Sequence, residues 1–89
     1  MKTLIVYAHP EPRSLNGSLK DLAVSTLENA GHEVRVSDLY AMNWKAVVDA
    51  EDYGPHASSP LRVVRDSGRA FEAGTLTPDV LAEQEKLLW

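Results

Sequence analysis

The chain has 89 residues, of which 44% are hydrophobic and 25% charged, and its formal net charge is -4. This length allows one small domain with a packed core. The nine Lys and Arg residues are scattered, which excludes the clustered positive charge that proteins use to bind nucleic acid. The absence of cysteine excludes a disulfide scaffold and a thiolate metal site, and it fits a cytoplasmic location.

The first predicted element is a strand at Thr3–Ala8. Its sequence, TLIVYA, is apolar at almost every position, which is typical of a central strand of a parallel sheet that is covered on both faces. The apolar run Leu4–Ala8 is far shorter than the roughly 20 residues that a membrane span needs. We therefore expect no membrane span at this end of the chain.

A helix is predicted next, after a loop from His9 to Ser14 that contains two prolines. Ser14 is the expected N-cap and Gly31 the expected C-terminal stop. Apolar residues recur at helical spacing on one stripe, namely Leu15, Leu19, Leu22, Ala23, Leu27 and Ala30. We expect this stripe to face a sheet.

A second strand is predicted at Glu33–Leu39, where Val34 and Val36 alternate with polar residues. Strand, helix and strand in this order form a βαβ unit with a right-handed crossover, so the fold class is α/β with a parallel sheet. A long connection follows from Tyr40 to Pro60.

Two further helices are predicted, a short one at Ser67–Ala73 that Gly74 closes, and a last one that begins at Pro78. Two parallel strands cannot cover their own faces and edges. The pattern therefore predicts that residues 1–89 are the N-terminal part of a single, incomplete domain.

The loop after the first strand is the first candidate site, because ligands of parallel α/β sheets bind beyond the carboxyl ends of the strands. The following helix begins without an acidic residue in its first turn, which leaves its N-terminus open to an anion such as a pyrophosphate. Hydrogen-bond donors are available on His9, Ser14 and Asn16, and Arg13 adds positive charge. The alternative is that Ser14 is only an N-cap and His9 a loop residue without a ligand.

Three stretches carry a resemblance to a known family: YAHPEPRSLN after the first strand, SDLYAMNW after the second, and TPDVLAEQEKL in the last helix. In this order they resemble the N-terminal third to half of the NAD(P)H:quinone oxidoreductase family of flavodoxin-like proteins. The family also includes ancillary subunits of bacterial potassium-efflux systems.

The resemblance implies a flavin, usually FAD with FMN as an alternative, whose phosphates contact His9, Ser14, Leu15 and Asn16. It implies a homodimer that transfers hydride from NAD(P)H through the flavin to a quinone. The catalytic residues of the family correspond to positions beyond Trp89, so none is named in this chain. A flavin-binding subunit that regulates a potassium-efflux transporter is the alternative function.

The remaining polar residues have structural explanations. Asp38 and Asn43 are expected to shape a turn after the second strand, with Tyr40 and Trp44 packed under it. The acidic cluster of Asp49, Glu51 and Asp52 is interpreted as a solvated face. The three histidines lack ligand spacing, so no metal site is expected.

Overall fold

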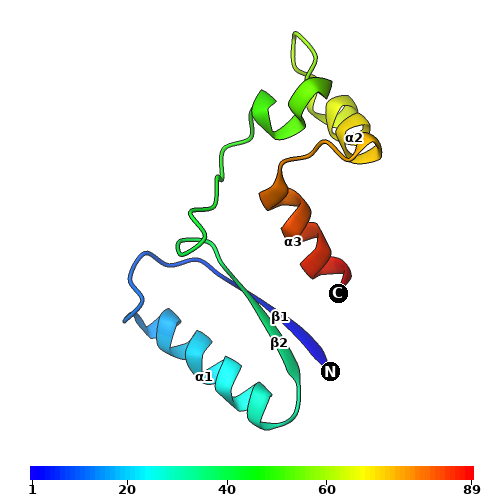
Figure 1. Cartoon of the computed structure of the whole chain (residues 1–89). Helices are drawn as coiled ribbons and strands as arrows, with labels where there is room; N and C mark the ends of the chain where they lie inside the picture. The colour runs from blue at the N-terminus through cyan, green and yellow to red at the C-terminus, as the bar shows by residue number, and fades with distance from the viewer. The chain divides into compact units, whose positions relative to one another are not determined.

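The computed structural model describes residues 1–89 with the exception of the His56 side chain. In chain order its elements are β1 (Lys2–Tyr7), α1 (Leu15–Asn29), β2 (Glu33–Asp38), the 3-10 helix η1 (Ala50–His56), α2 (Val63–Ala73) and α3 (Pro78–Leu88). Figure 1 labels the strands and the α-helices. The chain divides into two compact units. Unit 1 comprises Met1–Trp44 with Lys86–Trp89, and unit 2 comprises Lys45–Glu85.

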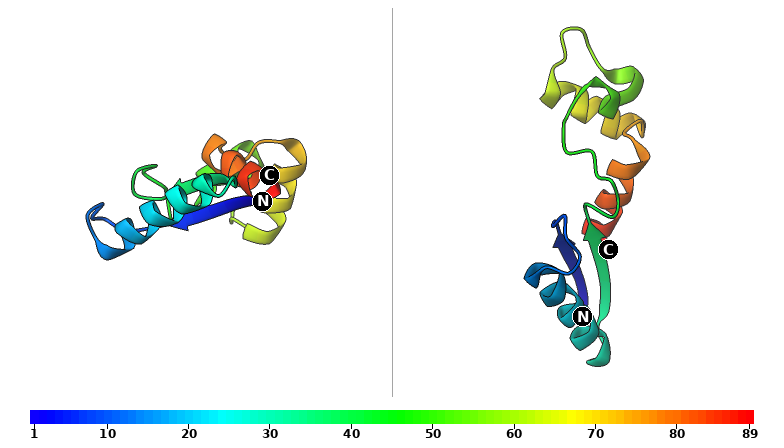
Figure 2. Two further views of the ribbon diagram at one scale, coloured as in Figure 1. Left: turned by 90° about the horizontal axis from the view of Figure 1, so that it is seen from below. Right: turned by 90° about the vertical axis from the view of Figure 1, so that its left-hand side faces the viewer.

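Unit 1 is built on the parallel pair of β1 and β2. The register runs from Lys2 opposite Glu33 to Tyr7 opposite Asp38, and α1 connects the two strands along one face of the sheet (Figure 2). The predicted α/β class and parallel sheet are confirmed. Each strand ends one residue earlier than predicted, a difference that is normal for strand boundaries.

Helix α1 packs on the sheet with a face that shares only Ala23 and Leu27 with the predicted stripe. Leu15, Leu19 and Leu22 are 75%, 55% and 63% exposed. The buried or half-buried positions are instead Gly17, Lys20, Ala23, Val24 and Leu27. Both sets recur at helical spacing, so the periodicity predicted a helix but could not decide which apolar stripe meets the sheet.

The opposite face of the sheet is only partly covered. Arg35 on β2 stacks on the Trp89 ring at 4.2 Å, and Lys86 Nζ donates to Ser37 Oγ at 3.2 Å. Val6 in the middle of the sheet is nevertheless 64% exposed. The prediction that the first strand is covered on both faces is therefore wrong for the described chain: Trp89 contacts Lys2 at the start of β1, but Val6 near its end is exposed.

Unit 2 holds an element that the sequence did not predict. The 3-10 helix η1 lies within the connection predicted for residues 40–60, and Asp49 and Asp52 form a reciprocal capping box at its start. Tyr53 in η1 is 5% exposed and Ala70 in α2 is fully buried, and these two residues are the buried apolar side chains of this unit among those described.

Helix α2 begins at Val63, four residues before the predicted start at Ser67. The reason is a contact made through its first turn: the fully buried Asp66 accepts the Arg62 N–H at 2.9 Å and the Ser58 N–H at 3.1 Å. The predicted end of α2 at Gly74 is confirmed, and Gly74 has a φ of 70°. The predicted start of α3 at Pro78 is confirmed as well.

Candidate functional site

The loop between β1 and α1 lies beyond the carboxyl end of β1, where ligands of parallel sheets bind. The Glu11 N–H donates to His9 Nδ1 at 3.0 Å, and the Glu11 carbonyl accepts the Ser14 N–H at 3.1 Å. His9 itself is half-buried. These local bonds order a loop in which Pro10 and Pro12 have no N–H group to donate.

The start of α1 has the predicted cap. Ser14 has an extended backbone, and its Oγ accepts the Gly17 N–H at 3.1 Å. The N–H groups of Leu15 and Asn16 have no acceptor among the described residues, and the first turn contains no acidic side chain. Two N–H groups and the positive end of the helix dipole are therefore available to an anion.

Gly17 lets the helix start close to the loop. A Cβ atom at this position would lie 2.2 Å from the Pro12 carbonyl oxygen and 3.1 Å from the Tyr7 hydroxyl, so only glycine fits without a backbone shift. The sequence reasoning treated Gly17 as an ordinary helix-start residue and missed this contact. The available signal was a glycine inside the first helical turn, where its low helix propensity calls for another reason.

Arg13 and Glu11 in the loop form an ion pair, so their charges balance. Glu11 Oε1 accepts the Arg13 N–H at 3.0 Å and Arg13 Nε at 3.1 Å, and these bonds lower the pKa of the Glu11 carboxyl. The sequence assigned Arg13 as added positive charge for an anion. The structure instead pairs that charge with Glu11, so neutral donors dominate the loop.

A lysine that the sequence reasoning did not consider packs beside the start of the site. Lys20 Nζ lies 5.2 Å from the centroid of the Tyr7 ring and 2.6 Å from Asp21 Oδ1. The hydrogen bond that Lys20 donates to Asp21 is the main cause that raises the Lys20 pKa. The ammonium group thus makes a cation–π contact with the buried ring of Tyr7. The Tyr7 hydroxyl has no hydrogen-bond partner among the described residues.

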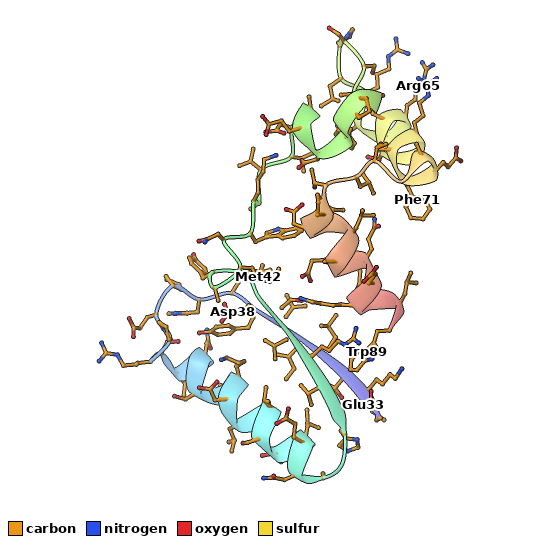
Figure 3. All side chains as sticks on the ribbon, viewed as in Figure 1. Glu33, Asp38, Met42, Arg65, Phe71 and Trp89 are labelled. Carbon is orange, nitrogen blue, oxygen red and sulfur yellow. The ribbon has the colours of Figure 1, made fainter. Side chains whose placement is uncertain are left out.

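The segment after β2 forms the predicted turn. The Asp38 carboxylate accepts the Ala41 N–H at 3.2 Å, and Asn43 adopts the left-handed conformation with a φ of 51°. Figure 3 labels Asp38 at the end of β2. Trp44 is half-buried as expected, but Tyr40 is 57% exposed because it lies on the outer side of this turn. The prediction that Tyr40 packs under the turn is wrong.

Two residues of the acidic cluster in unit 2, Asp49 and Asp52, cap the start of η1. Lys45 Nζ bonds Asp49 Oδ1 at 2.7 Å and Asp52 Oδ1 at 3.0 Å. The Asp49 N–H and then Lys45 lower the pKa of Asp52, while both carboxylates raise the pKa of Lys45. The interpretation as a merely solvated face is therefore wrong for Asp49 and Asp52, which act as capping residues. Over the described residues, no group of three or more His, Cys, Asp or Glu side chains is placed to hold a metal ion.

Comparison with known proteins places this geometry in a family. Residues 1–89 match the family described as having a flavodoxin-like fold. The chain belongs to this flavodoxin-like family. Its fold is also that of a solved structure from Klebsiella pneumoniae, provisionally described as a quinone reductase, with a TM-score of 0.95 and 59% sequence identity.

Two relatives carry enzyme names. The ribosyldihydronicotinamide dehydrogenase-like protein traD of Penicillium crustosum is 51% identical over 90 residues, which cover 100% of this chain and 34% of the relative. Human ribosyldihydronicotinamide dehydrogenase [quinone] is 42% identical over 88 residues, which cover 97% of this chain and 38% of the relative. The solved structure is likewise covered to 35% of its length. The chain thus spans about a third of the proteins that it matches.

These matches confirm the resemblance to quinone oxidoreductases that the three sequence stretches indicated. The names of these relatives do not mention a transporter subunit. Across the described residues, every helix is too short or too polar to cross a bilayer.

Proposed function

We propose that this chain supplies the flavin-phosphate-binding part of an NAD(P)H:quinone oxidoreductase, as the first section of one flavodoxin-like domain. The observation that carries the proposal is the open first turn of α1, after the loop that follows β1, in a chain with relatives named quinone dehydrogenases. A helix start with unpaired N–H groups and no carboxylate is suited to a phosphate.

The proposed contacts are the four residues indicated by the sequence. Leu15 and Asn16 offer main-chain N–H groups, Asn16 adds its side-chain amide, Ser14 offers its hydroxyl proton, and the His9 imidazole lies in the preceding loop. The hydroxyl of Ser14 can still donate while its oxygen accepts from Gly17, because a serine oxygen both donates and accepts. This donor set fits the phosphates of a flavin nucleotide.

We favour FAD over FMN because the donors extend from the loop into the helix start, which suits a pyrophosphate better than a single phosphate. The flavin would supply hydride transfer from NAD(P)H to a quinone, whereas this chain's own residues bind and orient its phosphate end. No residue of this chain is assigned a catalytic role. We further propose a cytoplasmic homodimer in which the flavin ring lies near the subunit boundary.

The first test is a titration of the protein, in its natural length, with FAD, followed by quenching of the flavin fluorescence. His9→Ala or Asn16→Ala should weaken FAD binding by a factor of about 5 to 100, the loss expected for one hydrogen bond to a charged group. His32→Ala is the matched control, because His32 lies after the opposite end of α1. Unchanged affinity in both site variants would overturn the assignment.

A second test separates the ligand and reaction classes. ADP should compete with FAD if a pyrophosphate is recognised, and inorganic phosphate should compete much more weakly. The flavin-loaded protein should oxidise NADPH or NADH in the presence of a quinone. Flavin binding without this oxidation would contradict the enzymatic part of the proposal and leave the binding part in place.

A further inference from the structure

The hydrogen bond between Glu11 and His9 determines more than the shape of the loop. A main-chain N–H group can only donate, so the 3.0 Å contact from Glu11 N requires His9 Nδ1 to be the acceptor. In a neutral imidazole the proton must then be on Nε2. The loop therefore selects one of the two tautomers of His9.

We infer that Glu11 is a positioning residue of the proposed phosphate site: its main-chain N–H holds His9 as the Nε2–H tautomer, so that the outer nitrogen of the ring is a hydrogen-bond donor. The phosphate contact in this inference rests on the proposed function. The opposite tautomer would present a lone pair at Nε2, which repels a phosphate oxygen instead of binding it.

The main chain of Glu11 is itself held from the helix side. Its carboxylate accepts two hydrogen bonds from Arg13, at 3.0 and 3.1 Å, and its carbonyl accepts the Ser14 N–H at 3.1 Å. Ser14 in turn caps α1 through Gly17. A continuous set of bonds thus connects the helix cap to the imidazole, and the orientation of His9 follows from the same residues that open the helix start.

The pairing of Glu11 with Arg13 has a consequence for charge. Glu11 binds Nε of Arg13 and balances its charge, so the donors assigned to a phosphate are the imidazole N–H, the Ser14 hydroxyl and main-chain N–H groups, beside a loop pair without net charge. Recognition by neutral dipoles is less sensitive to ionic strength than recognition by exposed ion pairs. We expect FAD affinity to change by less than about threefold between low and moderate salt.

The tautomer can be measured without any flavin. Nitrogen-15 NMR of histidine-labelled, ligand-free protein above pH 8 should show protonated Nε2 and unprotonated Nδ1 for His9, with the signals assigned by their loss in His9→Ala. An Nδ1–H tautomer, or a rapid mixture of both forms, would overturn the inference. Because this measurement needs no ligand, its outcome is independent of whether the protein binds flavin.

Two substitutions separate the main chain of Glu11 from its side chain. Glu11→Pro removes the N–H group, and the position already precedes Pro12 and is therefore restricted to extended backbone that proline tolerates. Glu11→Ala keeps the N–H group and should keep the Nε2–H signal of His9. Glu11→Pro should shift the His9 nitrogen signals toward the tautomer mixture of a histidine in a short unstructured peptide, and thermal unfolding of both variants reports whether the fold survives.

The affinity test is a double-mutant cycle with His9→Ala. Glu11→Pro should weaken FAD binding by about 5- to 30-fold when His9 is present and by less than about twofold when His9 is alanine. An equal loss in both backgrounds would mean that Glu11 acts on the loop as a whole, and would overturn its role through His9. An Nε2–H tautomer in a protein that binds no FAD would reject the proposed function and, with it, the phosphate contact, while the tautomer assignment would stand.

Discussion

The starts of helices α1 and α2 are held by different hydrogen bonds. At α2 a carboxylate from the first turn of the helix, Asp66, folds back on Arg62 and also binds both the N–H and the hydroxyl of Ser58. At α1 the first turn contains no carboxylate, and the N–H groups of Leu15 and Asn16 have no acceptor in the described chain. At α2 a buried carboxylate ties the helix to the residues before it, whereas at α1 the first turn carries no carboxylate that would repel an anion.

The difference suggests a way to distinguish a helix start that only stabilises the fold from one that binds an anion, namely whether its first turn contains a carboxylate. Side-chain acceptors in the first turn give stability, because they satisfy donors and complement the dipole. The start of α1 has the Ser14 cap but no carboxylate, so its remaining donors are left for an external anion. The comparison predicts that substitutions at the start of α2 change only the stability of the fold. Substitutions at the start of α1 should change both stability and FAD affinity, and the two can change in opposite directions.

The largest effect is expected at Asp66. Asp66→Ala removes a fully buried carboxylate and leaves the part-buried N–H groups of Ser58 and Arg62 without this acceptor, and should lower the melting temperature by about 10 °C. Glu72→Ala, on the exposed side of the same helix, is the control and should shift it by less than about 2 °C. Equal shifts in the two variants would show that Asp66 does not hold the start of α2.

The dependence on pH checks the same contact. Hydrogen bonding, mainly from the Arg62 N–H, lowers the Asp66 pKa from its ordinary 3.8, so the folded protein binds fewer protons here than the unfolded chain. The stabilisation is complete above that ordinary value and is lost as the pH falls through the lower, folded value. The melting temperatures of the protein and of Asp66→Asn should therefore converge on acidification below about pH 4.

An intermediate effect is expected from the glycines of the two helices. Gly17→Ala places a Cβ atom 2.2 Å from the Pro12 oxygen, and should lower the free energy of unfolding by about 2 kcal/mol. Gly68→Ala in α2 meets open space, and should raise it by up to about 1 kcal/mol through helix propensity. Urea unfolding measures both, and a Gly17→Ala variant as stable as Gly68→Ala would contradict the close approach of loop and helix.

The smallest effect on stability is expected when an acidic residue is placed in the first turn of α1. This substitution also tests most directly whether that turn binds a phosphate. Asn16→Asp should stabilise α1 by up to about 0.5 kcal/mol, because a carboxylate complements the dipole. The same charge should weaken FAD binding by about tenfold or more through repulsion of the phosphates. Asn29→Asp at the other end of α1 is the control, with slight destabilisation and unchanged FAD affinity. If the Asn16→Asp variant bound FAD with normal affinity, the phosphate could not bind at this helix start.

Local signals predicted most elements of unit 1. Consecutive apolar residues predicted β1, alternation predicted β2, and Ser14 and Gly31 predicted the ends of α1, where Gly31 has a φ of 87°. Each signal depends on a residue's own backbone preference or on neighbours within one turn. These elements could therefore be predicted without knowledge of what packs on them.

Contacts between distant positions escaped prediction. The start of α2 depends on Asp66 and Ser58, which are eight residues apart, and the capping box of η1 requires a turn that no periodic pattern announces. The face of α1 that meets the sheet depends on the crossover of the chain. Two apolar stripes on one helix are equivalent until the sheet is present.

For the candidate site, the sequence by itself determined its place after β1, the cap at Ser14 and the absence of acid from the first helical turn, because these follow from residue type and order. Only the tertiary structure decided that Gly17 lies against Pro12, that Glu11 neutralises Arg13 and that Glu11 donates to His9. Those contacts depend on how a proline-containing loop folds back on the helix, and interatomic distances of this kind are not encoded in any local propensity.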